Sequence, residues 1–450
     1  MDAGLGIGGL NIGKDELASS QFDLFDNVEI ETGVKKMYTQ TFHPISSSSS
    51  KGPFTFEFPA DPEKFTDAES IRLHGRMRIM KNDAGAVKNL PVDEKVSVVN
   101  NIFNSLWSSI NVRLNGTEIT DPSSRWYSYK SYFENLLSYS SGTKENILSF
   151  KGFIKDDAEK YDEVGTAGAA STNNGYLKRQ ALFAESKWVY FCINIHADIT
   201  TLRKYIPPNI KIMMELQRNS DEFSLLSHKS IDNFKIELKD LRMTVNRIEA
   251  SNEVMNYYVS KIKNRKMPRL SIDRSLLKTY TVTKGRSDLS EHNIISGYQL
   301  PDQIIIGVVV ESAHRGDITK NPFNFQTLGI TEASLVVNGV SEPPQLYKVD
   351  MDNGDKADLY ASFLENIGIG VDDRECGVTY EDFYGGCFLL VWDRTQDKCN
   401  RFHRHKHESG SIDVHIRTKA PLRETVTVVM YATYSADLLL DGDKVITPNF

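Results

Sequence analysis

The 450-residue sequence predicts an all-β protein built from two consecutive sandwiches of antiparallel strands. Three observations predict this fold class. Short stretches in which apolar and polar residues alternate recur along the chain between Gly, Pro, Asn and Asp residues, as is typical of strands with one buried face. The chain is also longer than one hydrophobic core usually serves. Finally, a strand–turn–strand–helix unit occurs once in each half, which indicates a duplicated domain.

The first copy of this unit begins with a strand predicted at residues 110–114, where apolar and polar residues alternate. Asn115-Gly116 follows, and this pair tolerates the two positive φ angles of a tight hairpin turn. The period then changes to that of a helix over residues 124–139, with Ser123 or Ser124 as its N-cap. The apolar stripe of the helix consists of Trp126, Tyr129, Phe133 and Leu136.

The second copy has its own hairpin turn, Asn338-Gly339, within residues 333–340. A helical stripe follows it, made of Tyr360, Phe363, Leu364 and Ile367. Glu134-Asn135-Leu136 in the first helix corresponds to Glu365-Asn366-Ile367 in the second. The neighbouring strands also pair in order: 71–80 with 304–310, 188–195 with 387–392, 210–216 with 412–416, and 234–245 with 426–433. The alternative is a loose alignment of two unrelated all-β domains.

The repeat divides the chain into three segments. Residues 1–26 are rich in glycine and show no alternation, so we expect a flexible N-terminal arm. Residues 27–250 are expected to form the first domain and residues 251–450 the second. Residues 251–266 are interpreted as a connecting helix or an extended linker, whose basic side chains form a solvated face rather than a nucleic-acid patch.

Two features interrupt the pattern of the first half. Residues 140–186 have no close match in the second half, and their acidic pairs and small residues predict a long exposed excursion. In the strand at residues 234–245 the apolar residues change from even to odd positions. A bulge at Lys239-Asp240 would account for this change.

Composition and charge exclude several classes of protein. Hydrophobic residues make up 40% of the chain and charged residues 25%, which is ordinary for a soluble globular protein. No run of about 18 apolar residues occurs, and the N-terminus lacks a signal-peptide pattern, so we expect no membrane span and synthesis in the cytosol. A net charge of −7 argues against a protein whose main task is to neutralise nucleic-acid phosphates, and we expect no sequence-specific nucleic-acid binding. Reduced thiols are expected for the four cysteines, Cys192, Cys376, Cys387 and Cys399.

No stretch of the sequence carries a convincing catalytic, cofactor or metal site. Alternate residues of a strand share one side, so Cys399, His403, His405 and His407 could converge on zinc. Their spacing matches no structural zinc pattern and basic residues lie between them, so an exposed polar loop is favoured. Residues 350–355 resemble a calcium loop but lack its closing Glu. We therefore expect no catalytic residues, no cofactor-binding residues and no metal ligands, and a protein that is not an enzyme.

Several motifs occur together in register. Residues 114–116 read Leu-Asn-Gly, and residues 127–137 read Tyr-x-Tyr-x-x-Tyr-x-x-x-Leu-Leu. Residues 300–309 contain Leu-Pro followed by an apolar run, and residues 321–325 read Asn-Pro-Phe-Asn-Phe. With a tail at residues 422–431 in which Arg423 replaces a proline, this set resembles the major capsid protein of Polinton/Maverick elements and adintoviruses, in the lineage of adenovirus hexon. The resemblance covers the chain from about residue 27 to its end.

This resemblance implies a double jelly roll, two consecutive eight-stranded sandwiches with short helices in the loops. It implies a structural capsid protein that trimerises into pseudo-hexameric capsomers and assembles an icosahedral shell around a double-stranded DNA genome. The implied partners are other copies of the chain and penton or minor capsid proteins. The implied location is the virion capsid, after synthesis in the host cytoplasm and assembly in the nucleus. Residues 140–186 and 341–360 would be candidates for an outer turret or for clasps between subunits.

The alternative function is a two-domain jelly-roll protein that binds or processes glycans. Paired carboxylates for such chemistry would be distant in the sequence and therefore invisible to a motif search. The two functions differ in the expected oligomeric state, because a shell protein should form trimers and the enzyme should be a monomer.

Overall fold

The structure is a computed structural model, and it describes residues 31–45, 52–83, 86–121, 126–166, 168–348, 356–369, 374–396, 407–440 and 446–449. The predicted N-terminal arm, residues 1–26, lies outside the described residues.

The first half of the chain forms two antiparallel sheets. One sheet has the strand order β1-β11-β3-β4, with β8 also paired to β3, and the other has the order β2-β9-β6-β7. A short extra pair joins β5 to β10. The strands are β1 Val34–Phe42, β2 Phe54–Phe58, β3 Lys64–Asp83, β4 Ala86–Lys88, β5 Val96–Val98, β6 Trp107–Leu114, β7 Thr117–Glu118, β8 Val189–Asn194, β9 Ile212–Arg218, β10 Leu225–Ser227 and β11 Phe234–Ala250.

The second half repeats this architecture. One sheet has the order β12-β19-β14-β17, with β20 paired to β19, and the other has the order β13-β18-β15-β16. The strands are β12 Arg269–Val282, β13 Glu291–Gln299, β14 Gln303–Val310, β15 Ile330–Val337, β16 Val340–Lys348, β17 Leu389–Asp393, β18 Ser409–Thr418, β19 Val426–Leu440 and β20 Ile446–Asn449.

The two halves have the same topology. In order across the sheets, β1-β11-β3-β8 corresponds to β12-β19-β14-β17, and β2-β9-β6-β7 corresponds to β13-β18-β15-β16. Each half is therefore an eight-stranded jelly roll, and the double jelly roll expected from the sequence is confirmed. Every pair of segments matched across the halves by sequence falls on topologically equivalent strands. The division of the chain near residue 250 stays a prediction.

Local features of the repeat are also confirmed. Asn115 and Gly116 have φ angles of 48° and 87°, and Asn338 and Gly339 have nearly the same values, 50° and 83°. Both turns close two-residue hairpins, because Leu114 pairs with Thr117 and Val337 pairs with Val340. The register of β11 against β3 shifts between Lys239 and Arg242, where Asp240 has a φ of 55°. This is the expected bulge.

Short helices connect and cover the strands. They are α1 Ile102–Ser105, α2 Tyr127–Leu137, α3 Ser141–Thr143, α4 Asn174–Leu182, α5 Asp221–Ser224, α6 Asn252–Lys263, α7 Glu311–Arg315, α8 Lys356–Asn366 and α9 Tyr380–Tyr384. The segment after the first jelly roll is a helix rather than an extended linker, since α6 is capped by the Ser251 side chain, which accepts the Val254 N–H. None of the helices in the described ranges is long and apolar enough to span a membrane.

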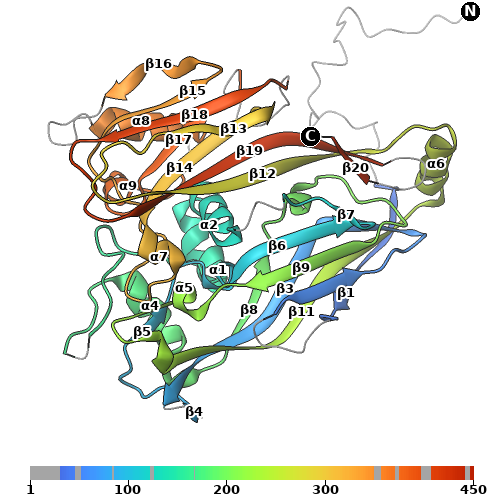
Figure 1. The fold of residues 1–450 in the computed structure, drawn as a ribbon. Helices are drawn as coiled ribbons and strands as arrows, with labels where there is room; N and C mark the ends of the chain where they lie inside the picture. Colours follow the sequence, from blue (N-terminus) through green and yellow to red (C-terminus); the bar gives the residue numbers. More distant parts are fainter. Residues whose placement is uncertain are drawn as a thin grey trace, which may run out of the picture.

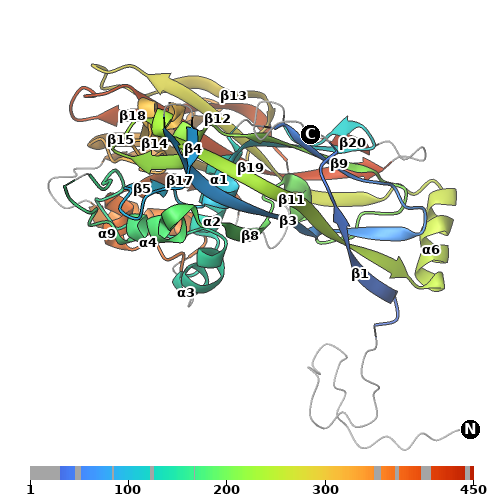
Figure 2. The same ribbon diagram turned by 90° about the horizontal axis from the view of Figure 1, so that it is seen from below.

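The two jelly rolls lie against each other, with α2 between them (Figure 1). In both views α6 is at one end of the molecule, and α4 and α9 are near the other (Figures 1 and 2). Buried apolar residues of both jelly rolls belong to one connected cluster. The chain thus has a continuous core that passes through the contact between its two lobes. Two independent sandwiches would each have a core of their own.

Candidate functional site

Helix α2 (Tyr127–Leu137) is the central element of the junction between the lobes (Figure 1). Three residues of its predicted stripe, Tyr129, Phe133 and Leu136, are fully buried, whereas the fourth, Trp126, is half-buried and precedes the helix. Almost every other side chain of the helix is buried as well, including Ser128 and Ser131. An amphipathic helix would leave one face to water. Instead, α2 is enclosed on all sides, so its polar residues must find partners within the protein.

The start of α2 was predicted wrongly. Its N-cap position is Trp126, and no side chain caps the helix there. Ser123 and Ser124, the predicted caps, lie outside the described residues. Trp126 instead packs against His314 of α7, with ring centroids 4.1 Å apart. The residue at the start of the helix thus contacts the second lobe, which local cap propensity could not indicate.

Aromatic side chains from both lobes interlock at this helix. Tyr132 of α2 stacks on Phe323 of the second lobe, with centroids 4.3 Å apart and ring planes 5° from parallel. Phe133 contacts Phe325 at 5.2 Å. Both Phe323 and Phe325 belong to the Asn-Pro-Phe-Asn-Phe motif and are fully buried. Each such aromatic pair adds about 0.5–1.5 kcal/mol beyond the area it buries, so the motif holds the two lobes together.

A buried ion pair of the first lobe is hydrogen-bonded to the second lobe at the same junction. Lys130 Nζ of α2 donates to Asp198 Oδ1 at 2.5 Å and to Ser275 Oγ of β12 at 2.6 Å. The Ser275 hydroxyl in turn donates to Asp198 Oδ1 at 2.7 Å. Only 9% of the Lys130 side chain and 4% of the Asp198 side chain are exposed. Burial lowers the pKa of Lys130, but the charges of Asp198 and Glu134 outweigh this effect and raise it, so the lysine is charged at neutral pH.

A second polar chain runs beside this pair. Glu134 accepts a hydrogen bond from the Tyr431 hydroxyl of β19 at 2.8 Å, and its other oxygen lies 2.6 Å from His196 Nδ1. Burial by itself would raise the pKa of Glu134. The charge of Lys130 and the contact with His196 outweigh that effect, and the pKa is lowered from 4.5 to about 2. Glu134 is therefore an anion at neutral pH that connects α2 to the central strand of a sheet in the second lobe.

Residues 140–186 form a third part of the junction, and the expectation that this excursion is exposed was wrong. Phe153, Tyr161 and Tyr176 are buried. Asp156 pairs with Arg179 inside the first lobe, 2.5 Å from Nη2, and accepts a hydrogen bond from Asn321 of the second lobe at 3.1 Å. The acidic residues looked like a solvated run because their partners are distant in the sequence.

The same segment is tied to the second lobe along its length. The Tyr161 hydroxyl lies 2.8 Å from Cys387 Sγ, and Asp162 accepts hydrogen bonds from the Asn321 N–H at 2.7 Å and from the Asn324 amide at 2.6 Å. Lys155 is paired with Asp382 of α9. Residues 140–186 therefore act as a clasp between the two lobes of one chain. Whether they also contact neighbouring subunits stays a prediction.

Chemical reactivity at the junction is low. Burial raises the pKa of Cys387 to about 11, so its thiol is protonated at neutral pH and unsuited to act as a nucleophile. Burial likewise raises the pKa of Cys376. A cavity of about 260 Å³ lies at the junction, lined by residues that include Glu134, His196 and Tyr431. These polar side chains are engaged with one another, which favours a structural role for them.

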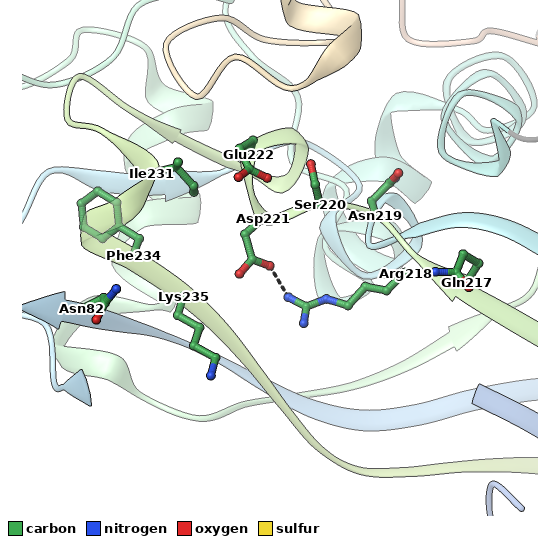
Figure 3. A pocket seen from close by; sticks show the side chains of 10 residues that line it. All are labelled: Asn82, Gln217, Arg218, Asn219, Ser220, Asp221, Glu222, Ile231, Phe234 and Lys235. Atoms are coloured by element: carbon green, nitrogen blue, oxygen red, sulfur yellow. Dashed lines mark hydrogen bonds and ion pairs between the residues drawn. The ribbon is translucent and has the colours of Figure 1, made fainter. Parts of the chain in front are cut away.

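A larger hollow, of about 590 Å³, lies in the first lobe where β9 leads into α5 (Figure 3). Arg218 and Asp221 form an ion pair at its wall. Lys235 from β11 points into the space below this pair (Figure 3). None of its ten lining residues is His or Cys. The hollow has a polar wall but no nucleophile paired with a base.

Most of the candidate metal ligands identified in the sequence lie outside the described residues. Cys399, His403 and His405 lie outside the described residues, as do residues 350–355, while His407 is exposed. Among the described residues, one group of His, Cys, Asp and Glu could hold a metal ion, namely His292, Asp413 and His415. Sequence reasoning missed this group because β13 and β18, which bring it together, are more than 100 residues apart. The only local signal was an Asp and a His on either side of an apolar residue in a strand.

Comparisons with known proteins agree on the fold. No protein-family profile matches the chain. An uncharacterised protein of Caenorhabditis elegans is 23% identical over 332 residues, which cover 72% of this chain and 75% of the relative. Among solved structures, a chain of the Sputnik virophage matches with a TM-score of 0.60 at 12% identity, covering 98% of this chain and 93% of its own length. The Faustovirus major capsid protein matches with a TM-score of 0.56 at 8% identity and 92% coverage of both chains. The mavirus major capsid protein matches with a TM-score of 0.53 at 10% identity, covering 98% of this chain and 95% of its own.

Proposed function

We propose that this chain is a major capsid protein that trimerises into pseudo-hexameric capsomers and assembles an icosahedral shell around a double-stranded DNA genome. One observation carries the proposal: two jelly rolls of identical topology are held in one fixed arrangement by a buried junction. A structural rather than a catalytic role follows from it.

The geometric argument concerns symmetry. A cyclic trimer of a chain with two similar lobes presents six similar lobes, so it has the outline of a hexagon and fits a six-fold position of a closed lattice. Such a trimer needs heterologous interfaces that close on themselves, which leaves its outer sides free to contact other trimers. The lobes can keep six-fold spacing only if they do not move relative to each other. The hydrogen bonds that join Lys130 and Asp198 to Ser275, the aromatic pairs and the clasp at residues 140–186 all resist that movement.

The comparisons support this proposal over the whole chain rather than one domain. The similar virophage, Faustovirus and mavirus structures match at least 92% of the chain, so both jelly rolls and their mutual arrangement contribute to the likeness. The sequence motifs at residues 114–116, 127–137 and 321–325 support the finer proposal that the chain belongs to the Polinton/Maverick and adintovirus lineage. The proposed partners are other copies of the chain and penton or minor capsid proteins. The proposed location is the virion, after cytoplasmic synthesis and nuclear assembly.

The oligomeric state of the purified chain tests the proposal. Size exclusion with light scattering should give about 153 kDa, three times the chain mass of 50.9 kDa. Negative-stain electron microscopy of the same peak should show particles with a hexagonal outline. A monomer of about 51 kDa at micromolar concentration, with no hexagonal particles or shells under any assembly condition, would overturn the proposal. Glycan binding by that monomer would favour the alternative function.

A further inference from the structure

Three potential metal ligands meet on the outer face of a sheet in the second lobe. His292 lies on β13, and Asp413 and His415 lie on β18, its neighbour in the sheet. Their ligand atoms all lie within 4.8 Å of one another. This group is separate from the junction between the lobes, and none of the contacts described there uses it.

The alternation of β18 places two of the ligands side by side. Ile412, Val414 and Ile416 are fully buried in the core, so Asp413 and His415 point to the opposite face. Residues two apart on a strand are about 6.5–7 Å apart, which leaves room for one ion between their side chains. A carboxylate and an imidazole are therefore presented together on a regular, hydrogen-bonded strand.

An irregularity in β13 brings in the third ligand. Glu291 pairs with Val414 and Ile295 pairs with Ile412, so four steps along β13 match two steps along β18. The two extra residues form a bulge in which Asn293 has a φ of 52°. Bulges redirect side chains and are frequent beside functional sites. Here the bulge directs His292 toward β18, with Nδ1 3.5 Å from Asp413 Oδ2 and its ring 5.6 Å from that of His415.

The carboxylate is already oriented for binding. Asp413 Oδ1 accepts the backbone N–H of Asn293 at 2.6 Å, which leaves Oδ2 facing the histidines. Ligating carboxylates in metal sites are commonly held by such a hydrogen bond from outside the coordination sphere. The next outward residue of β18 is a cation, Arg417, but its Nη1 lies 3.6 Å from Glu332 Oε2, which offsets its charge.

We propose that His292, Asp413 and His415 bind one Zn²⁺ ion, with a water molecule as the fourth ligand. Two imidazoles and one carboxylate form a donor set that suits zinc, and three protein ligands with one open position are a common zinc arrangement. Ligand atoms about 2.0–2.2 Å from zinc lie closer together than 4.8 Å, so binding draws them inward. The His292 side chain is 72% exposed and can rotate to make this movement. Because β13 is an edge strand of its sheet, the ion would fasten that edge to β18.

Zinc titration of the metal-free full chain tests the site. The protein is stripped with a chelator, dialysed at pH 7.5 and titrated with Zn²⁺ against a chromophoric competitor. We expect one ion per chain through this site, and His292→Ala, Asp413→Asn and His415→Ala each to weaken it at least tenfold. Asp413→Asn is the most conservative variant, because an Asn oxygen can still accept the Asn293 N–H. His43→Ala, which removes an exposed histidine elsewhere, should bind as the wild type does.

Two further measurements separate this site from other sources of zinc binding. The stretch with Cys399, His403 and His405 could bind zinc independently, so a His403→Ala/His405→Ala variant is titrated in parallel. Hydrogen exchange of residues 291–299 should slow on adding zinc, and the Asp413→Asn variant should lose this effect while melting within a few degrees of the wild type. The proposal is overturned if the wild type binds no zinc tighter than about 100 μM, if the three variants bind as tightly as the wild type, or if only the His403/His405 variant loses binding. None of these results depends on whether the chain forms trimers.

Discussion

Removing the Lys130 ammonium should destabilise the folded chain severely, and the structure gives the magnitude. In Lys130→Met, the Asp198 carboxylate would stay in a site where only 4% of its side chain is exposed, with Ser275 as its remaining hydrogen-bond donor. Breaking a buried ion pair by removing one partner typically costs about 3–5 kcal/mol, because a charge is left without compensation. For lobes of about 200 residues, this corresponds to a fall in melting temperature on the order of 10 °C.

A matched control is available on the surface. Lys88 pairs with Asp83 at 3.0 Å, but the two side chains are 61% and 57% exposed. Lys88→Met should therefore cost less than about 1 kcal/mol, as exposed ion pairs do. Thermal and urea unfolding of both variants should be followed by circular dichroism at one protein concentration, since association also shifts apparent stability.

A double variant separates charge from packing. Adding Asp198→Asn to Lys130→Met removes the uncompensated charge, so the double variant should recover about 1–3 kcal/mol relative to the sum of the single changes. The reasoning would be refuted if Lys130→Met unfolded at the same midpoint as Lys88→Met. It would also fail if the two changes at Lys130 and Asp198 were simply additive, because the buried pair would then contribute no coupling.

Three other predictions follow from the same structure. Acid should weaken the fold through Glu134, whose pKa is lowered from 4.5 to about 2. The ionised carboxylate therefore contributes about 3 kcal/mol to the free energy of unfolding above pH 4.5, and this contribution is lost as the pH falls through about 2. In the Glu134→Gln variant, the free energy of unfolding measured with urea should lack this pH dependence between pH 4.5 and about 2. Gly307→Ala should cost more than about 2 kcal/mol in thermal melts, because the new Cβ would lie 2.5 Å from Phe325 Cδ1; a melting temperature equal to the wild type would contradict this close approach. Gly116→Ala meets no atom within 4 Å but has a φ of +87°, so it should cost about 1 kcal/mol. Gly142→Ala, also in open space but within α3 and without a positive φ, should leave the melting temperature unchanged or raise it. Equal melting of the two variants would show that the turn is not strained.

The sequence alone determined the features that depend on local periodicity. Alternation identified the strands, the two Asn-Gly pairs identified equivalent hairpins, and the slip in apolar parity identified the bulge at Lys239-Asp240. Order along the chain was enough to match the halves, because the two halves share one topology even though residues 140–186 change the spacing between their elements. These signals involve residues that are close in the sequence or that recur in both halves, so they can be recognised without knowledge of the tertiary structure.

Only the tertiary structure decided how the two lobes are joined and where polar residues converge. The acidic residues in 140–186 looked like a solvated excursion, yet Asp156 is buried between Arg179 and Asn321. His292 and Asp413 are equally unremarkable in the sequence, and the pairing of β13 with β18 brings them together. A buried charge is stabilised by partners that the fold supplies, and those partners lie anywhere along the chain. No local pattern records them, which is why the junction and the proposed metal site appear only once the strands are placed in space.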